Sequence, residues 1–512
     1  MSYRQAIVDG VVTLVPNGKR TNGHARPELM AYFNRPTKVA MSYDAARSGT
    51  DLDNHWAFAD SLDADCSNSK AVRHTLMKRS RYEAGSNGYY DGIIKTHCNM
   101  LVGVGPTLRM LTGNRAFNQY VEREFYRWTQ QTQLRRKLWA MCYARTADGE
   151  SFALIQNNPA LPEVQLDFLP IEAEQCQTPY LPTQERGYVD GIKRDAFGNV
   201  QWYDVLPYHP GSSQLSMTQE AVRVSPDAML HWFKLKRPGS SRSTPECTSS
   251  LNVGASSRRF REAVVAAAET AADFAALLET TLPPDEADAV TPLSTIEIAK
   301  RMMMALPDNT KPYQMKAEHP NASYEAFHRQ QISEQARPLS MPYNAAACDS
   351  STYSFASGKL DTLCYRAALD VERADCNDLV LDPLFREWFR EWRAIPDAST
   401  DRRLIVPNHQ WDWPTHPVID AVAEASSTNT KLLNGSTTLR QVYSDAGQDY
   451  EDQLSVMAED WFGDSSEESI AKARQINLLR NIPQAAIQAV TAVLGLQVGP
   501  QQSTSPNTEV QA

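Results

Sequence analysis

Candidate chemical groups are concentrated in residues 340–366, SMPYNAAACDSSTYSFASGKLDTLCYR. This segment contains a Ser-Gly-Lys triplet, two adjacent serines and a carboxylate: residues 357–359, Ser350, Ser351 and Asp349. Such groups could bind a nucleotide phosphate, supply a serine nucleophile, or serve a mechanical role without catalysis. The residues around them distinguish these three possibilities.

The Ser-Gly-Lys triplet does not fit a phosphate-binding loop. That loop requires Gly-x-x-x-x-Gly-Lys-Ser/Thr, because backbone amides surround the phosphates and the final hydroxyl holds magnesium. Tyr353 stands at the first glycine position and Leu360 at the hydroxyl position. We therefore expect no nucleotide site and no bound cofactor here.

The paired serines also lack the context of a nucleophile. A nucleophile elbow reads Gly-x-Ser-x-Gly after a strand, whereas this chain reads Ala-Cys-Asp-Ser-Ser-Thr. The Ser-x-x-Lys pattern fails because Ala356 lies three residues before Lys359. No histidine is nearby, so a serine hydrolase using Ser350 or Ser351 is the less favoured alternative.

Metal ligands are equally sparse. Residues 51–65 hold five aspartates without the spacing or the glycine of a calcium loop. His409, Asp412 and His416 are read as part of a loop near a strand. Eight isolated cysteines form no CxxC pair, so we expect reduced and mostly buried thiols. No metal site is expected.

Composition and charge limit the classes of protein to which this chain could belong. The chain has 512 residues, 42% of them hydrophobic and 22% charged, which is ordinary for a folded protein of about three domains. A net charge of −10 argues against a protein that binds double-stranded DNA tightly, because tight binding needs a basic surface. An acidic surface would repel the phosphates and let DNA move past it. Glu269 and Asp273 interrupt the apolar residues 263–278, so no membrane span is expected, and the first residues predict no signal peptide.

The pattern of apolar residues predicts an α+β fold. Alternation with a period of two over residues 149–235 predicts several strands, with a hairpin turn at residues 195–199. Helical periodicity predicts helices at residues 86–105, 114–136, 323–337, 357–392, 418–433, 438–446, 450–462 and 470–496.

A further helix is predicted at residues 256–281. Its apolar residues follow spacings of four, three, four, three and four, which is a heptad seam: Phe260, Val264, Ala267, Ala271, Phe274 and Leu278. Small side chains on this seam would let helices approach closely. The sequence alone favours the simpler interpretation, an amphipathic core helix.

Several segments together resemble the lambda-type family of tailed-phage portal proteins, collinearly over residues 43–461. They are RSRYEAGSNGYYDGIIKTHCNMLVGVGPTL, DGES, GIKRDAFGNVQWYDV, AMLHWFKLKRPG, the segment at 340–366, and VIDAVAEASSTNTKLLNGSTTLRQVYSDAGQDYED. Each motif alone is weak, but the ordered set is specific. The chain departs from the pattern at Ala421 and Ala423, where the family often has Pro and Lys, and after the Arg-Pro-Gly motif.

The resemblance implies a non-enzymatic homo-oligomeric ring, a dodecamer, at one capsid vertex of the virion. Double-stranded DNA would be packaged and ejected through it, and the ring would assemble in the host cytoplasm. Implied partners are the terminase large subunit, the major capsid protein and a head–tail adaptor. The implied regions are wing (1–254 and 358–415), stem helices (255–281 and 321–339), clip (282–320), tunnel loop (340–357) and crown (416–512), with a disordered tail.

The same resemblance makes the opening segment a loop that projects into the channel. Its candidate channel residues are Tyr343, Asn344, Asp349, Ser350, Ser351, Thr352 and Tyr353. Small polar side chains and one acidic group would touch a moving duplex without holding it. The alternative within the same class is another virion protein, either a coat protein or a head–tail adaptor.

Overall fold

The computed structural model describes residues 3–8, 11–16, 59–178, 187–213, 220–273, 277–280, 310–313, 324–395, 406–415, 421–445 and 448–480. The chain divides into two units, residues 1–62 and 63–512, and each is described by itself. In the first unit, β1 (Tyr3–Val8) pairs antiparallel with β2 (Val11–Pro16).

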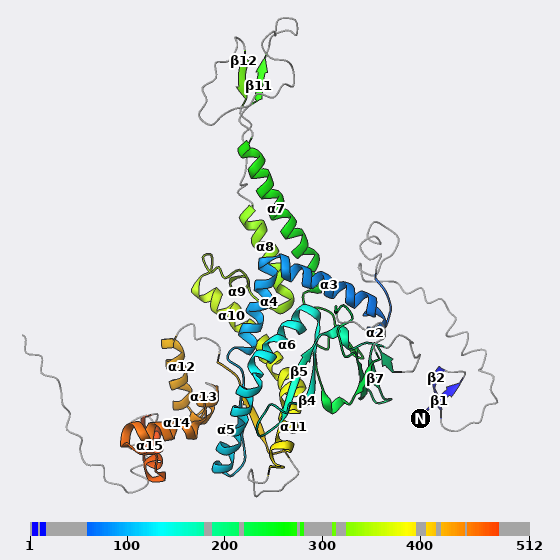
Figure 1. The fold of residues 1–512 in the computed structure, drawn as a ribbon. Helices are drawn as coiled ribbons and strands as arrows, with labels where there is room; N and C mark the ends of the chain where they lie inside the picture. The colour runs from blue at the N-terminus through cyan, green and yellow to red at the C-terminus, as the bar shows by residue number, and fades with distance from the viewer. Residues whose placement is uncertain are drawn as a thin grey trace, which may run out of the picture. The chain divides into compact units, whose positions relative to one another are not determined.

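The second unit contains both helices and strands, as the α+β prediction required (Figure 1). Its helices are α2 (Ala64–Ser67), α3 (Lys70–Ser86), α4 (Gly88–Val102), α5 (Arg115–Thr132), α6 (Leu134–Asp148), α7 (Leu251–Asp273), α8 (Tyr324–Ala336), α9 (Tyr343–Ala347), α10 (Phe355–Cys376), α11 (Asp382–Trp392), α12 (Ala421–Leu433), α13 (Leu439–Asp445), α14 (Tyr450–Phe462) and α15 (Glu467–Arg480). A π-helical segment, Asn377–Leu381, joins α10 to α11.

The strands form small antiparallel sheets. Their bounds are β3 (Thr107–Met110), β4 (Glu150–Asn157), β5 (Leu166–Ile171), β6 (Tyr188–Val189), β7 (Ile192–Arg194), β8 (Val200–Val205), β9 (Val222–Val224), β10 (Met229–Phe233), β11 (Leu277–Thr280), β12 (Thr310–Tyr313) and β13 (His409–Asp412). The strand orders are β10-β4-β5, β6-β7-β8-β9, β13-β3 and β11-β12.

The predicted hairpin between β7 and β8 is confirmed. The Asp195 carboxylate accepts the backbone N–H groups of Phe197 and Asn199, each at 2.8 Å. Gly198 takes φ of +90°, a left-handed conformation that glycine adopts without steric cost. The turn chemistry read from the sequence therefore sets the register of this sheet.

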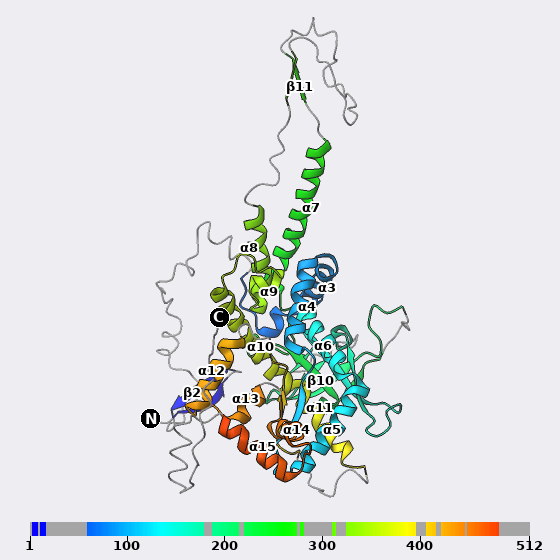
Figure 2. The ribbon, with the colours of Figure 1, turned by 90° about the vertical axis from the view of Figure 1, so that its left-hand side faces the viewer.

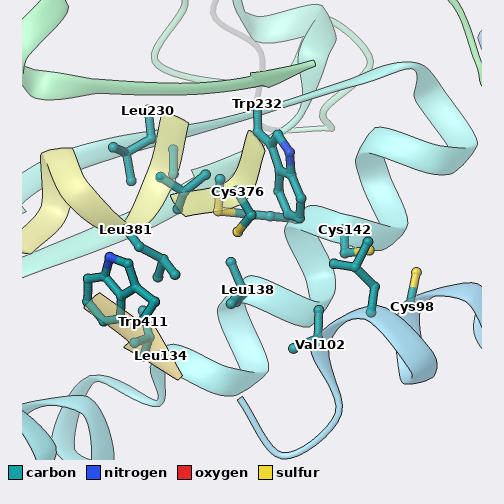
Figure 3. Packing of buried hydrophobic residues seen from close by; sticks show 14 of the residues in the cluster. Cys98, Val102, Leu134, Leu138, Cys142, Leu230, Trp232, Cys376, Leu381 and Trp411 are labelled. Carbon is teal, nitrogen blue, oxygen red and sulfur yellow. The ribbon is translucent and has the colours of Figure 1, made fainter. Parts of the chain in front are cut away.

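The largest core includes residues of α4, α6, β10, α10, the π-helical segment and β13 (Figure 3), together with residues of α11 and β4. The aromatic residues of the FREWFREWR stretch, residues 385–393, lie on α11 and are buried there. Trp388 packs on Phe125 edge-to-face, with ring centroids 5.0 Å apart, and stacks on Trp392 at 5.6 Å. Five of the eight cysteines are also buried, and all eight are free thiols.

Helices α7 and α8 run side by side, as both ribbon views show (Figures 1 and 2). The Phe260 ring on α7 stacks on Tyr324 of α8 with centroids 5.8 Å apart, and meets Phe327 edge-on at 5.1 Å. Val264 and Ala267, the next seam residues, are half-buried. At Phe260 the seam therefore makes a contact within the chain.

The predicted helix at residues 256–281 is too long. Leu278 lies in β11, opposite Pro312 of β12, and not on a continuing helix. Pairing with a distant strand overrides the helical spacing, and the threonines and two prolines that follow also disfavour a helix. Phe274 lies outside the described residues, and Ala271 lies within α7.

Two other predicted boundaries are wrong. The predicted helix at residues 114–136 is two helices, because Gln133 takes φ of +54° and ends α5 before α6 begins. The stretch at 340–357 is not wholly irregular, because residues 343–347 form α9 and α10 begins at Phe355. Three consecutive alanines, which favour a helix, explain α9.

Candidate functional site

The candidate site is the loop between α8 and α10, residues 340–354, which we call the α8–α10 loop. Ser340 and Cys348 both have positive φ, +55° and +53°, and they bracket α9. Met341 and Ala346 are buried in the main core. The first half of the loop is thus anchored to the body.

One arginine holds the two halves of this loop together. The Arg329 guanidinium of α8 lies 4.6 Å from the ring centroid of Tyr343 and 5.5 Å from that of Tyr353. The Tyr343 hydroxyl also lies 3.4 Å from the Asp349 carboxylate. Cation–π contacts of this kind are worth about 0.5–1 kcal/mol each at exposed sites. The loop is therefore a defined structure clamped to α8.

The second half of the loop is an exposed turn. Asp349 accepts the backbone N–H of Ser351 at 2.9 Å, and this hydrogen bond lowers the pKa of the Asp349 carboxyl group. Ser350, Ser351 and Thr352 are exposed. Residues 340–354 contain no lysine or arginine, so the charge that this turn presents is negative.

The structure places the seven predicted loop residues in one segment but divides them between two environments. Tyr343 and Asn344 belong to α9 and are half-buried. Tyr353 is half-buried against Arg329. The exposed groups are those of the turn between them.

Local hydrogen bonds explain why the Ser-Gly-Lys triplet is no phosphate loop. These residues form the first turn of α10, where the Ser354 hydroxyl accepts the Ser357 N–H at 3.3 Å. The Gly358 N–H donates to the Ser354 carbonyl at 3.0 Å. Both amides are engaged in capping and helix bonds. Among the described residues, no hydrogen bond joins a histidine to Ser350 or Ser351.

The loop leads into α10, which a buried ionic network fixes to the body. The Glu372 carboxylate accepts hydrogen bonds from Arg145, from His97 at 3.1 Å and from Lys234 at 2.9 Å. Arg145 also pairs with Glu246 at 3.2 Å. These partners outweigh the effect of burial and hold the pKa of Glu372 well below its usual range.

A second buried network joins α3, β4 and β10 to the connector after β10. Burial alone would raise the pKa of Glu150, but Arg242 at 2.8 Å, His231 at 3.2 Å and nearby Arg73 lower it to about 2. Arg242 further donates to the carbonyls of Cys176, Asp190 and Ala173. One guanidinium thus ties four segments together.

One cluster in the described residues has the composition of a metal site: Glu172, Glu174 and His209. Arg81 donates to Glu174 at 2.9 Å and lies 3.2 Å from Glu172, so both carboxylates already have a guanidinium partner. His209 Nδ1 accepts the Gly211 N–H at 3.0 Å. His209 Nε2 lies 3.6 Å from Glu172 and 3.7 Å from Glu174.

His409 and Asp412 have different hydrogen-bond partners. His409 Nε2 lies 3.2 Å from the Asp382 carboxylate, while Asp412 accepts from Gln410 at 2.8 Å. His416 lies outside the described residues, as do residues 51–58 of the aspartate-rich stretch. Of the aspartates that are described, Asp63 caps α2 and Asp65 accepts from the Ser241 amide.

The sequence matches the family described as phage portal protein, lambda family, over residues 54–373, which is more than half of the chain. The chain belongs to the lambda family of phage portal proteins. No curated protein matches the sequence. The family is structural and not enzymatic.

Among solved structures, this portal protein resembles chains of gene transfer agent particles. A chain from the virion of a native particle is 11% identical, with a TM-score of 0.45, over 75% of this chain and 97% of that chain. A chain from a native neck computed with C12 symmetry is 11% identical, with a TM-score of 0.42, over 74% and 94%. A chain from an empty-particle neck computed with C6 symmetry is 12% identical, with a TM-score of 0.45, over 73% and 93%.

The matched region of the portal protein contains α7, α8, the α8–α10 loop and most of α10. It also contains both buried ionic networks, which sequence reasoning missed. Glu372 and Arg145 lie 227 residues apart in sequence, so no local spacing could reveal their contact. Within the described residues, no helix has both the length and the apolar character that a bilayer crossing requires.

Proposed function

We propose that this portal protein forms a dodecameric ring at one vertex of a phage head, through which double-stranded DNA is packaged and later ejected. The observation that carries the proposal beyond the family is the α8–α10 loop. It offers an exposed turn of small polar groups with one carboxylate and no cation, on a clamped base. Such a surface contacts a duplex without holding its phosphates.

We assign the parts of the chain as wing (1–254 and 355–415), stem (255–276 and 321–339), clip (277–320, so that it includes β11), tunnel loop (340–354) and crown (416–512). The side-by-side packing of α7 and α8 supports a paired stem. The β11–β12 pair between them in sequence supports a small separate clip. The crown assignment is supported by the helices α12 to α15.

Charge supports a bore that DNA can slide through. The chain carries a net charge of −10, and Glu269 on α7 is exposed. Each lysine or arginine facing the duplex would release about one counterion and strengthen binding, and this effect multiplies around a ring. Acidic groups repel the phosphates and keep friction low.

The energy for packaging would come from a separate motor, the terminase large subunit, docked on the clip. The Ser-Gly-Lys amides of this chain are engaged within α10 and could not surround a phosphate. The remaining proposed partners are the major capsid protein around the wing and a head–tail adaptor below the ring. The ring would assemble in the host cytoplasm and remain in the virion.

Negative-stain imaging and mass photometry of the purified chain test this proposal. We expect closed rings with a central hole and a mass near twelve subunits of 57.3 kDa. The rings should persist from low to moderate salt. A chain that stays monomeric at every concentration and salt tested would contradict the proposal, as would solid particles without a hole.

A further inference from the structure

Helix α10 is apolar on two opposite sides. Its inner side places Tyr365, Leu369 and Cys376 in the main core, where all three are fully buried. Its outer side carries a second apolar row, which we call the outer stripe: Ala356, Leu360, Leu363, Cys364, Ala367, Val371 and Ala374. A helix that is apolar on both sides normally has both sides covered.

The outer stripe is exposed in the single chain. Leu360 and Val371 are each 63% exposed and Leu363 is 49% exposed. The four smaller members are exposed as well. Together these side chains expose roughly 300–400 Å² of apolar surface, which is comparable to the largest patch on a typical monomer. That area is about half of what one partner contributes to a standard interface.

The arrangement of the stripe is regular. At 100° per residue, its members fall within an arc of about 100° that holds no charged residue. One edge of the arc carries Lys359, Arg366 and Asp370, and the other carries Asp361 and Asp375. One edge therefore has a net charge of about +1 and the other of about −2.

The different charges of the two edges of the outer stripe bear on which partner could cover it. DNA is a poor occupant, because the stripe is apolar and one of its edges is wholly acidic. Two identical stripes facing each other would close into a dimer and stop, since such a contact uses the same patch on both subunits. A ring instead needs each subunit to present two different, complementary surfaces. The proposed ring therefore requires that the stripe meet a different surface of the neighbouring copy, and its edges of opposite charge can pair with charges of both signs there.

We infer that the outer stripe of α10 is the apolar centre of the contact with a second, neighbouring copy of this chain, an inference that rests on the proposed ring. The stripe packs against a different surface of that copy. The inner side of the same helix is fixed through Glu372, and its first residue follows the α8–α10 loop directly. The contact therefore also sets the position of each loop relative to the next.

Native cysteines provide a test that needs no core mutation. Cys364 lies on the stripe, whereas Cys66 lies on α2, and both are exposed in the single chain. Maleimide labelling with site-resolved mass spectrometry should show Cys364 labelled at least tenfold more slowly in rings than in unassembled chain. The rate at Cys66, compared in the same way, should change less than twofold.

Unassembled chain is obtained with the double variant Leu360→Asp/Leu363→Asp. We expect it to remain monomeric in mass photometry while keeping the circular dichroism spectrum of the wild type. The matched control is Tyr126→Asp, a residue of α5 that is 58% exposed, and it should still assemble. If the double variant is misfolded, unassembled wild type at high dilution replaces it in the labelling experiment.

The outcomes separate this inference from the proposed function. Wild-type rings together with double-variant rings would overturn the inference and leave the ring standing. Equal labelling of Cys364 in rings and free chain would do the same, and so would slow labelling in free chain, which would mean that the chain covers the stripe itself. Wild type that never assembles would overturn the proposed function and, with it, this contact.

Discussion

At the scale of single residues, two carboxyl groups show how surroundings decide charge. Glu150 is fully buried, yet Arg242, His231 and Arg73 lower its pKa to about 2, so it stays charged. Its stabilising effect is complete above the ordinary pKa near 4.5 and is lost as pH falls from there towards 2. Glu122 behaves in the opposite way, because burial raises its pKa to about 7.

Removing the charge of the Glu122 carboxylate should stabilise the folded protein. Its carboxylate accepts the Met110 N–H at 2.6 Å, and Asp452 and Asp449 nearby disfavour its charge. A raised carboxyl pKa means that the folded state is favoured at low pH and penalised as pH rises from about 4.5 through about 7. Glu122→Gln keeps the acceptor and removes the charge. We expect it to raise the free energy of unfolding by about 1–3 kcal/mol at pH 8.

Urea denaturation at pH 8 and at pH 4.5 measures this effect. The gain should be present at pH 8 and nearly absent at pH 4.5, where the wild-type carboxyl group is already protonated in the folded state. Gln131→Asn, on the exposed side of the same helix, should show no such pH dependence. An equal effect of Glu122→Gln at both pH values would show that charge is not its cause.

At the scale of elements, α10 depends on one carboxylate that several segments share. Glu372 is reached by His97 from α4, Arg145 from α6 and Lys234 from the segment after β10. Because these groups are buried, removing one charge leaves the others without compensation. Both the helix and the loop before it therefore rely on this network for their position.

Glu372→Gln tests that reliance. We expect it to lower the free energy of unfolding by about 3–5 kcal/mol, since Arg145 and Lys234 would each lose part of a buried counter-charge. Glu334→Gln on α8 removes an exposed carboxylate and should cost less than about 0.5 kcal/mol. Chemical denaturation of both variants at pH 7 measures these two losses in the free energy of unfolding. Similar small losses in the two variants would mean that the network does not anchor α10.

Sequence reasoning succeeded for elements whose pattern is local. Alternation between residues 149 and 235 marked a region of strands, although β9 was not predicted, and Asp195 with Gly198 marked a hairpin, because turn chemistry acts over four residues. It failed where pairing with a distant strand, or an unusual backbone conformation, determines the structure. Leu278 left its helical spacing to pair with β12, and Gln133 broke a helix in a conformation that its residue type does not signal.

The candidate site was predictable only as a segment. The small polar residues before α10 were identified from the sequence, but Arg329 was not, although it contacts both Tyr343 and Tyr353. Its role depends on α8 and α9 folding against each other, and no spacing within residues 340–366 encodes that. The outer stripe of α10 was likewise visible only as apolar content, because exposure cannot be read from periodicity.

At the scale of the whole molecule, the proposed ring would repeat each charge of the subunit around one axis, and the proposed function depends on this repetition. A single half-buried Asp349 on this turn matters little in one chain, because charges near the surface are screened by solvent and salt. In the proposed dodecamer, the same turn would be repeated as a closed belt facing one duplex. A change of one charge per subunit then changes the belt by about twelve charges, so the ring amplifies substitutions that leave the fold untouched.

Lysines in the exposed turn should therefore stall DNA. Ser350→Lys/Ser351→Lys adds about two dozen positive charges to a dodecameric belt, and each phosphate contact adds about one unit to the salt dependence of binding. Neither serine is buried, so rings should form normally. We expect slower in-vitro packaging than with the matched Ser350→Asn/Ser351→Asn variant, and partial recovery as salt rises. Equal packaging rates for the lysine and asparagine rings at every salt concentration would place this turn away from the DNA. Lysines that surround a duplex would attract its phosphates and change the rate.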